Sequence, residues 1–130
     1  MQLQAQYSIL KDIGPINIRS NHYKGYTYTE MQPIGGSDKE LVLLQGVMRG
    51  GDSFLHLAYM MALKGWRVLM PPREILMQDL TFPYGLDHVA VQVLKFVKKV
   101  SKQKRYTILA HSLGALIGLR MCLIAREDVR

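Results

Sequence analysis

The sequence predicts an α/β fold in which a mostly parallel sheet carries helices on both faces. Two observations predict it. Short apolar runs of strand length alternate with helix-like segments from residue 41 onward. The run at 41–44 is continuously apolar, which is typical of a strand buried on both faces, and residues 66–70 are interpreted as a second buried strand. With 48% hydrophobic and 21% charged residues and no linker or repeat, the 130 residues predict one domain over 1–130.

The first forty residues predict strands and a turn. Residues 7–10 are interpreted as a short strand, and residues 25–30 are rich in aromatic and β-branched side chains, which favour strands. Pro33 opens a turn over 33–38 that contains two glycines. His22 falls in what we expect to be a loop before the second of these strands.

A glycine-bearing loop at 45–52 leads into the first predicted helix. Asp52 or Ser53 can cap a helix over 53–64, because their side-chain oxygens can accept from its free N–H groups. Gly65 stands where a helix end favours a left-handed residue. The strand at 66–70 then ends abruptly at two prolines.

The second half of the chain predicts two helices and one strand. Residues 73–84 have weak periodicity and turn signals. Residues 86–102 form the clearest amphipathic helix, with most lysines opposite an apolar stripe. A strand at 106–109 and a helix at 113–126 follow. The predicted stripe consists of Leu86, Ala90, Leu94 or Val93, Val97 and Val100.

The candidate nucleophile is Ser112, in the pentapeptide Ala110-His111-Ser112-Leu113-Gly114. The pentapeptide lies between a predicted strand and a predicted helix. A sharp turn in that place exposes a serine hydroxyl and needs small flanking residues, which Ala110 and Gly114 provide. The backbone N–H of Leu113 could then donate to an oxyanion. The alternative is that Ser112 only caps the helix.

A second oxyanion donor has to come from a loop beside the serine strand. By position, the loop after residue 44 is the candidate, and we choose the backbone N–H of Val47. The alternative is a simple glycine-rich connection, and periodicity alone does not decide between the two.

Three segments together resemble the N-terminal half of an α/β-hydrolase, over residues 25–130. They are Gln45-Gly46-Val47, Gly65-Trp66-Arg67-Val68 and Ala110-His111-Ser112-Leu113-Gly114. The family commonly has His-Gly-x, Gly-Tyr-x-Val and Gly-x-Ser-x-Gly in this order. The resemblance implies Ser112 as nucleophile and the N–H groups of Val47 and Leu113 as the oxyanion hole.

Two departures from the family pattern keep a non-catalytic interpretation open. Gln45 replaces the usual histidine, and Ala110 replaces the first elbow glycine. Divergent members such as maspardin-like proteins also depart from His-Gly, and the resemblance to them implies partner binding instead of hydrolysis.

The catalytic acid and base of such a mechanism are not found in this sequence. Hydrolases of this family order them as Ser, then Asp or Glu, then His. After Ser112 the sequence has Glu127 and Asp128 but no histidine. A 13-residue helix would carry those two acids about 20 Å away. We therefore expect a pattern truncated after the nucleophile helix, with base and acid beyond Arg130, or a partner protein or second copy that completes the sheet.

The remaining histidines do not suggest a metal or cofactor. We expect His56 and His88 to be surface residues of helices, and His111 to serve packing or hydrogen bonding. None pairs with another at metal-ligand spacing, and Cys122 is the only cysteine. We expect no metal and no cofactor.

The net charge of +7 raises the question of an acidic partner. Six of the seventeen basic residues lie within 95–105, where a solvated helix face is the plain interpretation. Poor aromatic interleaving disfavours nucleic acid. The single cysteine, the lack of a leader-like N-terminus and the short apolar segment at 113–125 predict a cytoplasmic protein without a transmembrane segment.

Two functions follow from these patterns. The first is a serine hydrolase that acts on a small-molecule ester, thioester or amide through an acyl-enzyme on Ser112. The second is a non-catalytic α/β-hydrolase-like binding or scaffold protein.

Overall fold

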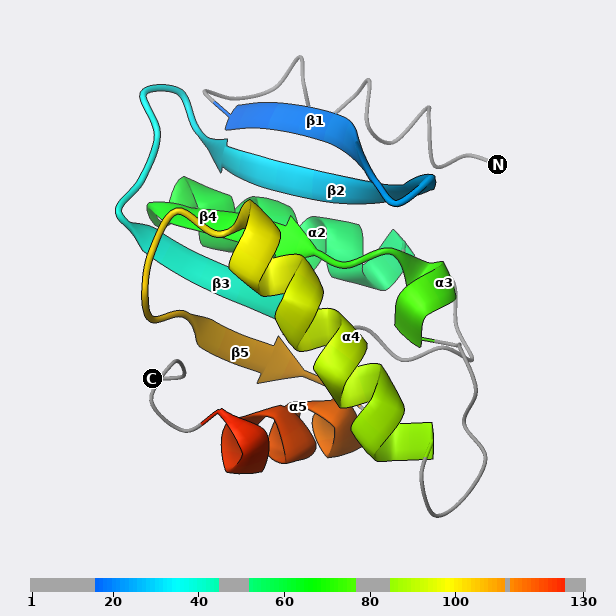
Figure 1. Cartoon of the computed structure of the whole chain (residues 1–130). Helices are drawn as coiled ribbons and strands as arrows, with labels where there is room; N and C mark the ends of the chain where they lie inside the picture. The colour runs from blue at the N-terminus through cyan, green and yellow to red at the C-terminus, as the bar shows by residue number, and fades with distance from the viewer. Residues whose placement is uncertain (1–15, 45–51, 77–84, 112, 126–130) are drawn as a thin grey trace.

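The computed structural model describes residues 16–44, 52–76, 85–111 and 113–125, and the account below concerns these ranges. They form five strands and four helices (Figure 1). In chain order these are β1 (Ile16–Tyr23), β2 (Tyr26–Pro33), β3 (Lys39–Leu44), α2 (Asp52–Leu63), β4 (Trp66–Met70), α3 (Arg73–Leu76), α4 (Gly85–Val100), β5 (Thr107–Ala110) and α5 (Leu113–Ile124).

The five strands form one mixed sheet in the order β1-β2-β4-β3-β5. β3 pairs in parallel with β4 on one side and with β5 on the other. β2 pairs antiparallel with both β1 and β4. The predicted α/β class with helices on both faces is confirmed, and its parallel part is β4-β3-β5.

The N-terminal hairpin is where the sequence prediction was incomplete. The predicted strand at 25–30 is β2, but β1 was not predicted, and His22 lies in β1 opposite Thr27, not in a loop. The polar centre of β1 obscured its alternation. Lys24 and Gly25 join the two strands with φ values of 50° and 82°, as a two-residue hairpin turn requires. The strand predicted at 7–10 lies outside the described residues.

Two apolar cores lie on opposite faces of the sheet. Successive residues of β3 alternate between them: Leu41 and Leu43 pack with α2, while Val42 and Leu44 pack with α4 and α5. In Figure 1, α4 crosses the near face and α2 lies behind the sheet. The central strand is thus buried on both faces, as its continuous apolar run predicts.

Helix α4 anchors the hairpin to the parallel strands. Phe96 is fully buried, and the rings of Tyr23 and Tyr28 meet it edge-on with centroids 5.1 and 4.9 Å away. The sequence left Leu94 and Val93 as alternatives for one position of the apolar stripe. Val93 is fully buried and Leu94 is only partly buried, so Val93 occupies that position. Residues 73–76, predicted as irregular, form the short helix α3, whose Leu76 is buried in the same core.

The outer edge of the described sheet is formed by β5, next to α5. Leu109 of β5 is partly exposed, and α5 turns a row of apolar side chains away from the core. Since α5 is apolar on every side except at Arg120, its packing against the sheet uses only some of its apolar side chains. The outward residues are Leu116, Leu119, Leu123 and Ile124.

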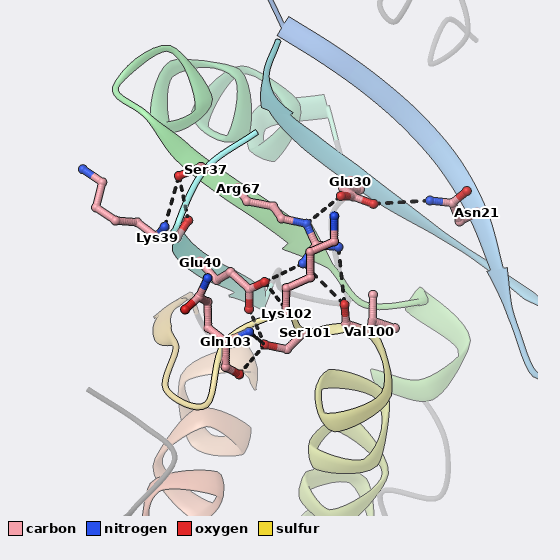
Figure 2. A network of polar contacts seen from close by, with 10 residues as sticks. All are labelled: Asn21, Glu30, Ser37, Lys39, Glu40, Arg67, Val100, Ser101, Lys102 and Gln103. Carbon is pink, nitrogen blue, oxygen red and sulfur yellow. Dashed lines mark hydrogen bonds and ion pairs between the residues drawn. The ribbon is translucent and has the colours of Figure 1, made fainter. Parts of the chain in front are cut away.

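A buried ionic network joins β2, β3, β4 and the end of α4 (Figure 2). The Arg67 guanidinium donates to Glu30 at 2.6 Å and to Glu40 at 2.5 Å, and all three side chains are buried. Glu40 also accepts from the hydroxyl of Ser101 and, at 2.8 Å, from the backbone N–H of Lys102. Burial acts to lower the pKa of Arg67, but hydrogen bonds and charge from Glu30 and Glu40 outweigh it and raise the pKa.

Because removing one partner of a buried ion pair leaves uncompensated charge, we expect Arg67→Met to lower the free energy of unfolding by about 3–5 kcal/mol. Urea unfolding followed by circular dichroism measures this. The matched control is Arg120→Met, which breaks the exposed pair with Asp87 and should change stability little. If the two substitutions lowered the free energy of unfolding equally, the buried network would not stabilise the fold more than an exposed ion pair does.

Across the described residues, none of the helices combines the length and the apolar character needed to cross a bilayer.

Candidate functional site

The candidate site lies where β5 gives way to α5, at the carboxyl end of the central strand. β5 ends at Ala110, which pairs with Leu44, and α5 begins at Leu113. The backbone N–H of His111 donates to the Leu44 carbonyl at 3.1 Å. The N–H of Gly114 donates to the carbonyl of His111 at 3.0 Å. These two bonds tie the start of the helix to the end of β3.

Gly114 allows the helix to approach β3 this closely. A Cβ on Gly114 would clash with the carbonyl oxygen of Leu44 and lie 2.9 Å from its carbon. One turn later, a Cβ on Gly118 would lie 3.3 Å from a methyl carbon of Ile108. The expectation that position 114 must be small is therefore supported by backbone contact. The second glycine was missed, although its spacing of four residues places it on the same helix face.

The topology makes this end of the sheet a natural ligand site. From β3 the chain passes to β4 on one side and later to β5 on the other, so the strand order reverses at β3. In open α/β sheets, ligands bind outside the carboxyl ends of the strands at such a point. The end of β3 and the β5–α5 junction both lie there.

Of the three predicted site residues, the structure describes one. Leu113 is the first residue of α5, so its N–H has no acceptor within the helix. Ser112 and Val47 lie outside the described residues, as do Gln45, Glu127 and Asp128. Their roles stay predictions.

The histidines of the described segments are dispersed. His56 and His88 are exposed on α2 and α4, as expected, and His111 is exposed beside the junction. Within these ranges, no three His, Cys, Asp or Glu side chains lie close enough to hold a metal ion together.

Solved structures share the fold of this chain, whereas comparisons of its sequence find no match. No protein-family model matches the sequence, and no curated protein matches it. Solved structures do match. An alpha/beta hydrolase enzyme from the metagenome of lagoon sediments at Mar Chica, Morocco, superposes with a TM-score of 0.69 at 24% identity, over 85% of this chain and 48% of that one.

Two further solved structures agree. A protein from Acinetobacter baumannii named as a lipase has a TM-score of 0.70 at 18% identity, over 99% of this chain and 44% of that one. A Vigna radiata epoxide hydrolase mutant has a TM-score of 0.64 at 16% identity, over 88% of this chain and 36% of that one.

The chain therefore has the fold of the N-terminal part of an α/β-hydrolase. It spans less than half the length of these solved structures. The similarity is one of fold, and it does not single out a maspardin-like branch.

We expect Gly114→Ala to lower the free energy of unfolding by about 1–3 kcal/mol, because the added methyl must displace backbone instead of a side-chain tip. Gly118→Ala is the matched control. Its methyl would meet side-chain carbons only, of Ile108 at 3.3 Å, Leu44 at 3.6 Å and Ala110 at 3.7 Å, and the helix gains about 1 kcal/mol of propensity. Thermal unfolding of both variants measures the difference, and a Gly118→Ala loss equal to that of Gly114→Ala would refute the special closeness at Leu44.

Proposed function

We propose that this chain carries the nucleophile of a serine hydrolase acting on a small-molecule ester, thioester or amide. The observation that supports this most strongly is the junction at which Leu44 receives the His111 N–H and touches Gly114. It sets a strand end directly against a helix start, on either side of Ser112. That is the context in which a serine serves as a nucleophile.

In the proposed reaction, the Ser112 hydroxyl oxygen bonds to the substrate carbonyl carbon while its proton passes to a base. The N–H groups of Leu113 and Val47 donate to the oxyanion that forms. The alcohol, thiol or amine then leaves with a proton, which gives an acyl-enzyme. Water, deprotonated by the same base, releases the acid and restores the hydroxyl.

The base and its orienting acid form the part of the proposal that needs further polypeptide. No histidine follows Ser112 in the sequence. The solved structures with this fold are more than twice as long as the segment they share with this chain. We propose that sequence beyond Arg130 supplies both groups and also covers the open edge of β5. The single cysteine is compatible with a reducing location such as the cytoplasm, which we retain as part of the proposal.

The second candidate is a non-catalytic binding or scaffold protein with the same fold. The missing histidine and the Gln45 replacement favour it. In that case Ser112 caps α5, and a partner protein or a second copy of the chain pairs with β5.

Labelling with a fluorophosphonate probe separates the two candidates, because a base-activated serine reacts and a helix-capping serine does not. We expect the native protein to be labelled at Ser112, as located by peptide mass spectrometry, and Ser112→Ala to lose both labelling and esterase turnover. His111→Ala is the matched control and should retain labelling, since the exposed His111 has no catalytic role in the proposal. An unlabelled native protein would favour the binding function.

The intact mass of the protein purified from its source tests the need for further polypeptide. We expect a mass above that of 130 residues, with an Asp or Glu and then a His in the additional sequence. A mass equal to that of the 130 residues would overturn the triad mechanism and direct attention to a second copy or a partner at β5.

A further inference from the structure

A groove unconnected with the candidate catalytic junction lies at the opposite end of β5. It has a volume of about 720 Å³ and is formed by the last turns of α4, the segment 101–106 and the end of α5. Tyr106 precedes β5 and His111 follows it, so at about 3.3 Å per residue the groove and the junction are about 16 Å apart along the strand. The groove therefore lies at the far end of β5 from the junction.

The rim of the groove is cationic. Lys95, Lys98, Lys104 and Arg105 line it, and no acidic residue of the described segments does. Lys95 and Lys98 lie three residues apart on one face of α4, and both are exposed. Lys98 also suits the negative end of the helix dipole. That role does not account for Lys95, one turn earlier, or for Lys104, beyond the helix.

The groove is also lined by apolar side chains. These are Val91 and Leu94 of α4 and Ile124 of α5, together with the buried ring of Tyr106. Ile124 is 46% exposed, so a ligand in the groove can cover it. A groove lined by both apolar and positively charged side chains matches a molecule with an alkyl body and an anionic head.

The shape and the side chains disfavour other anions. Single-stranded nucleic acid is typically bound by exposed aromatic rings on which bases stack, and Tyr106, the one ring that the described residues bring to this groove, is 5% exposed. A membrane presents a broad surface, whereas the groove is hollow and of limited volume. A volume of about 720 Å³ lies within the range of small-molecule sites.

We propose that this groove binds a single-chain anionic amphiphile, a long-chain carboxylate, with its head between Lys95, Lys98 and Lys104 and its alkyl chain along Leu94 and Ile124. The head forms charge-assisted hydrogen bonds with the lysines. Burial of the chain supplies the main favourable free energy. The site is independent of the proposed hydrolysis, and it would hold its ligand whether or not Ser112 is reactive.

The test is a calorimetric titration of the native protein with palmitate below its critical micelle concentration. Hexadecanol serves as the ligand without charge and acetate as the ligand without a chain. We expect saturable one-to-one binding of palmitate and at least tenfold weaker binding of both controls. Lys95→Gln/Lys98→Gln should weaken palmitate about tenfold, and Ile124→Asp should abolish its binding.

The matched control is Lys64→Gln/Lys99→Gln, which removes the same charge from exposed lysines outside the groove. It should bind palmitate as the native protein does. If both double variants weakened palmitate binding equally, the loss would be explained by net charge alone, and the proposed site would be wrong. The proposal would also be wrong if hexadecanol bound as tightly as palmitate. It would be wrong as well if the protein bound only phosphatidylserine vesicles or polyadenylate. Ser112→Ala should bind palmitate unchanged, which keeps this test separate from that of the proposed hydrolase.

Discussion

The carbonyl group of Leu44 is the point on which the candidate site depends. It accepts the N–H of His111, and it leaves no room for a side chain on Gly114. One backbone group thus fixes both the end of β5 and the start of α5. Because the carbonyl belongs to a strand buried on both faces, it cannot move without disturbing two cores. The position of the β5–α5 junction is therefore set by the sheet.

The opposite end of the same strand is held by charge. Glu40, near the start of β3, shares Arg67 with Glu30 and receives the N–H of Lys102. The contacts of Glu40 with Ser101 and Lys102 span more than sixty residues of sequence, and they fasten the end of α4 to the sheet. The basic segment around residue 102 owes its position to this buried network, which leaves its lysines free to line a surface groove.

The sequence predicted the parallel half of the fold well, because each element there has a local signal. A continuous apolar run marked β3, and the two prolines after Met70 marked the end of β4. Gly65 adopts the expected positive φ at the end of α2, and lysines outlined α4. The antiparallel hairpin was harder. β1 has a polar centre, and its turn uses Lys24 in place of a favoured turn residue. At the candidate site, the need for a small residue at 114 was predictable, but the Leu44 contact was not, because it joins residues seventy positions apart.

That separation has a consequence for how the molecule assembles. The β1–β2 hairpin closes across two residues, whereas β3 meets β5 only after more than sixty intervening residues have been ordered. Contacts between distant positions form late, because a long loop must close before they are made. We therefore expect the hairpin to organise early during synthesis and the β5–α5 junction to be completed among the last elements. Any reactivity at this junction would then arise only once β1, β2, β3 and β4 are in place.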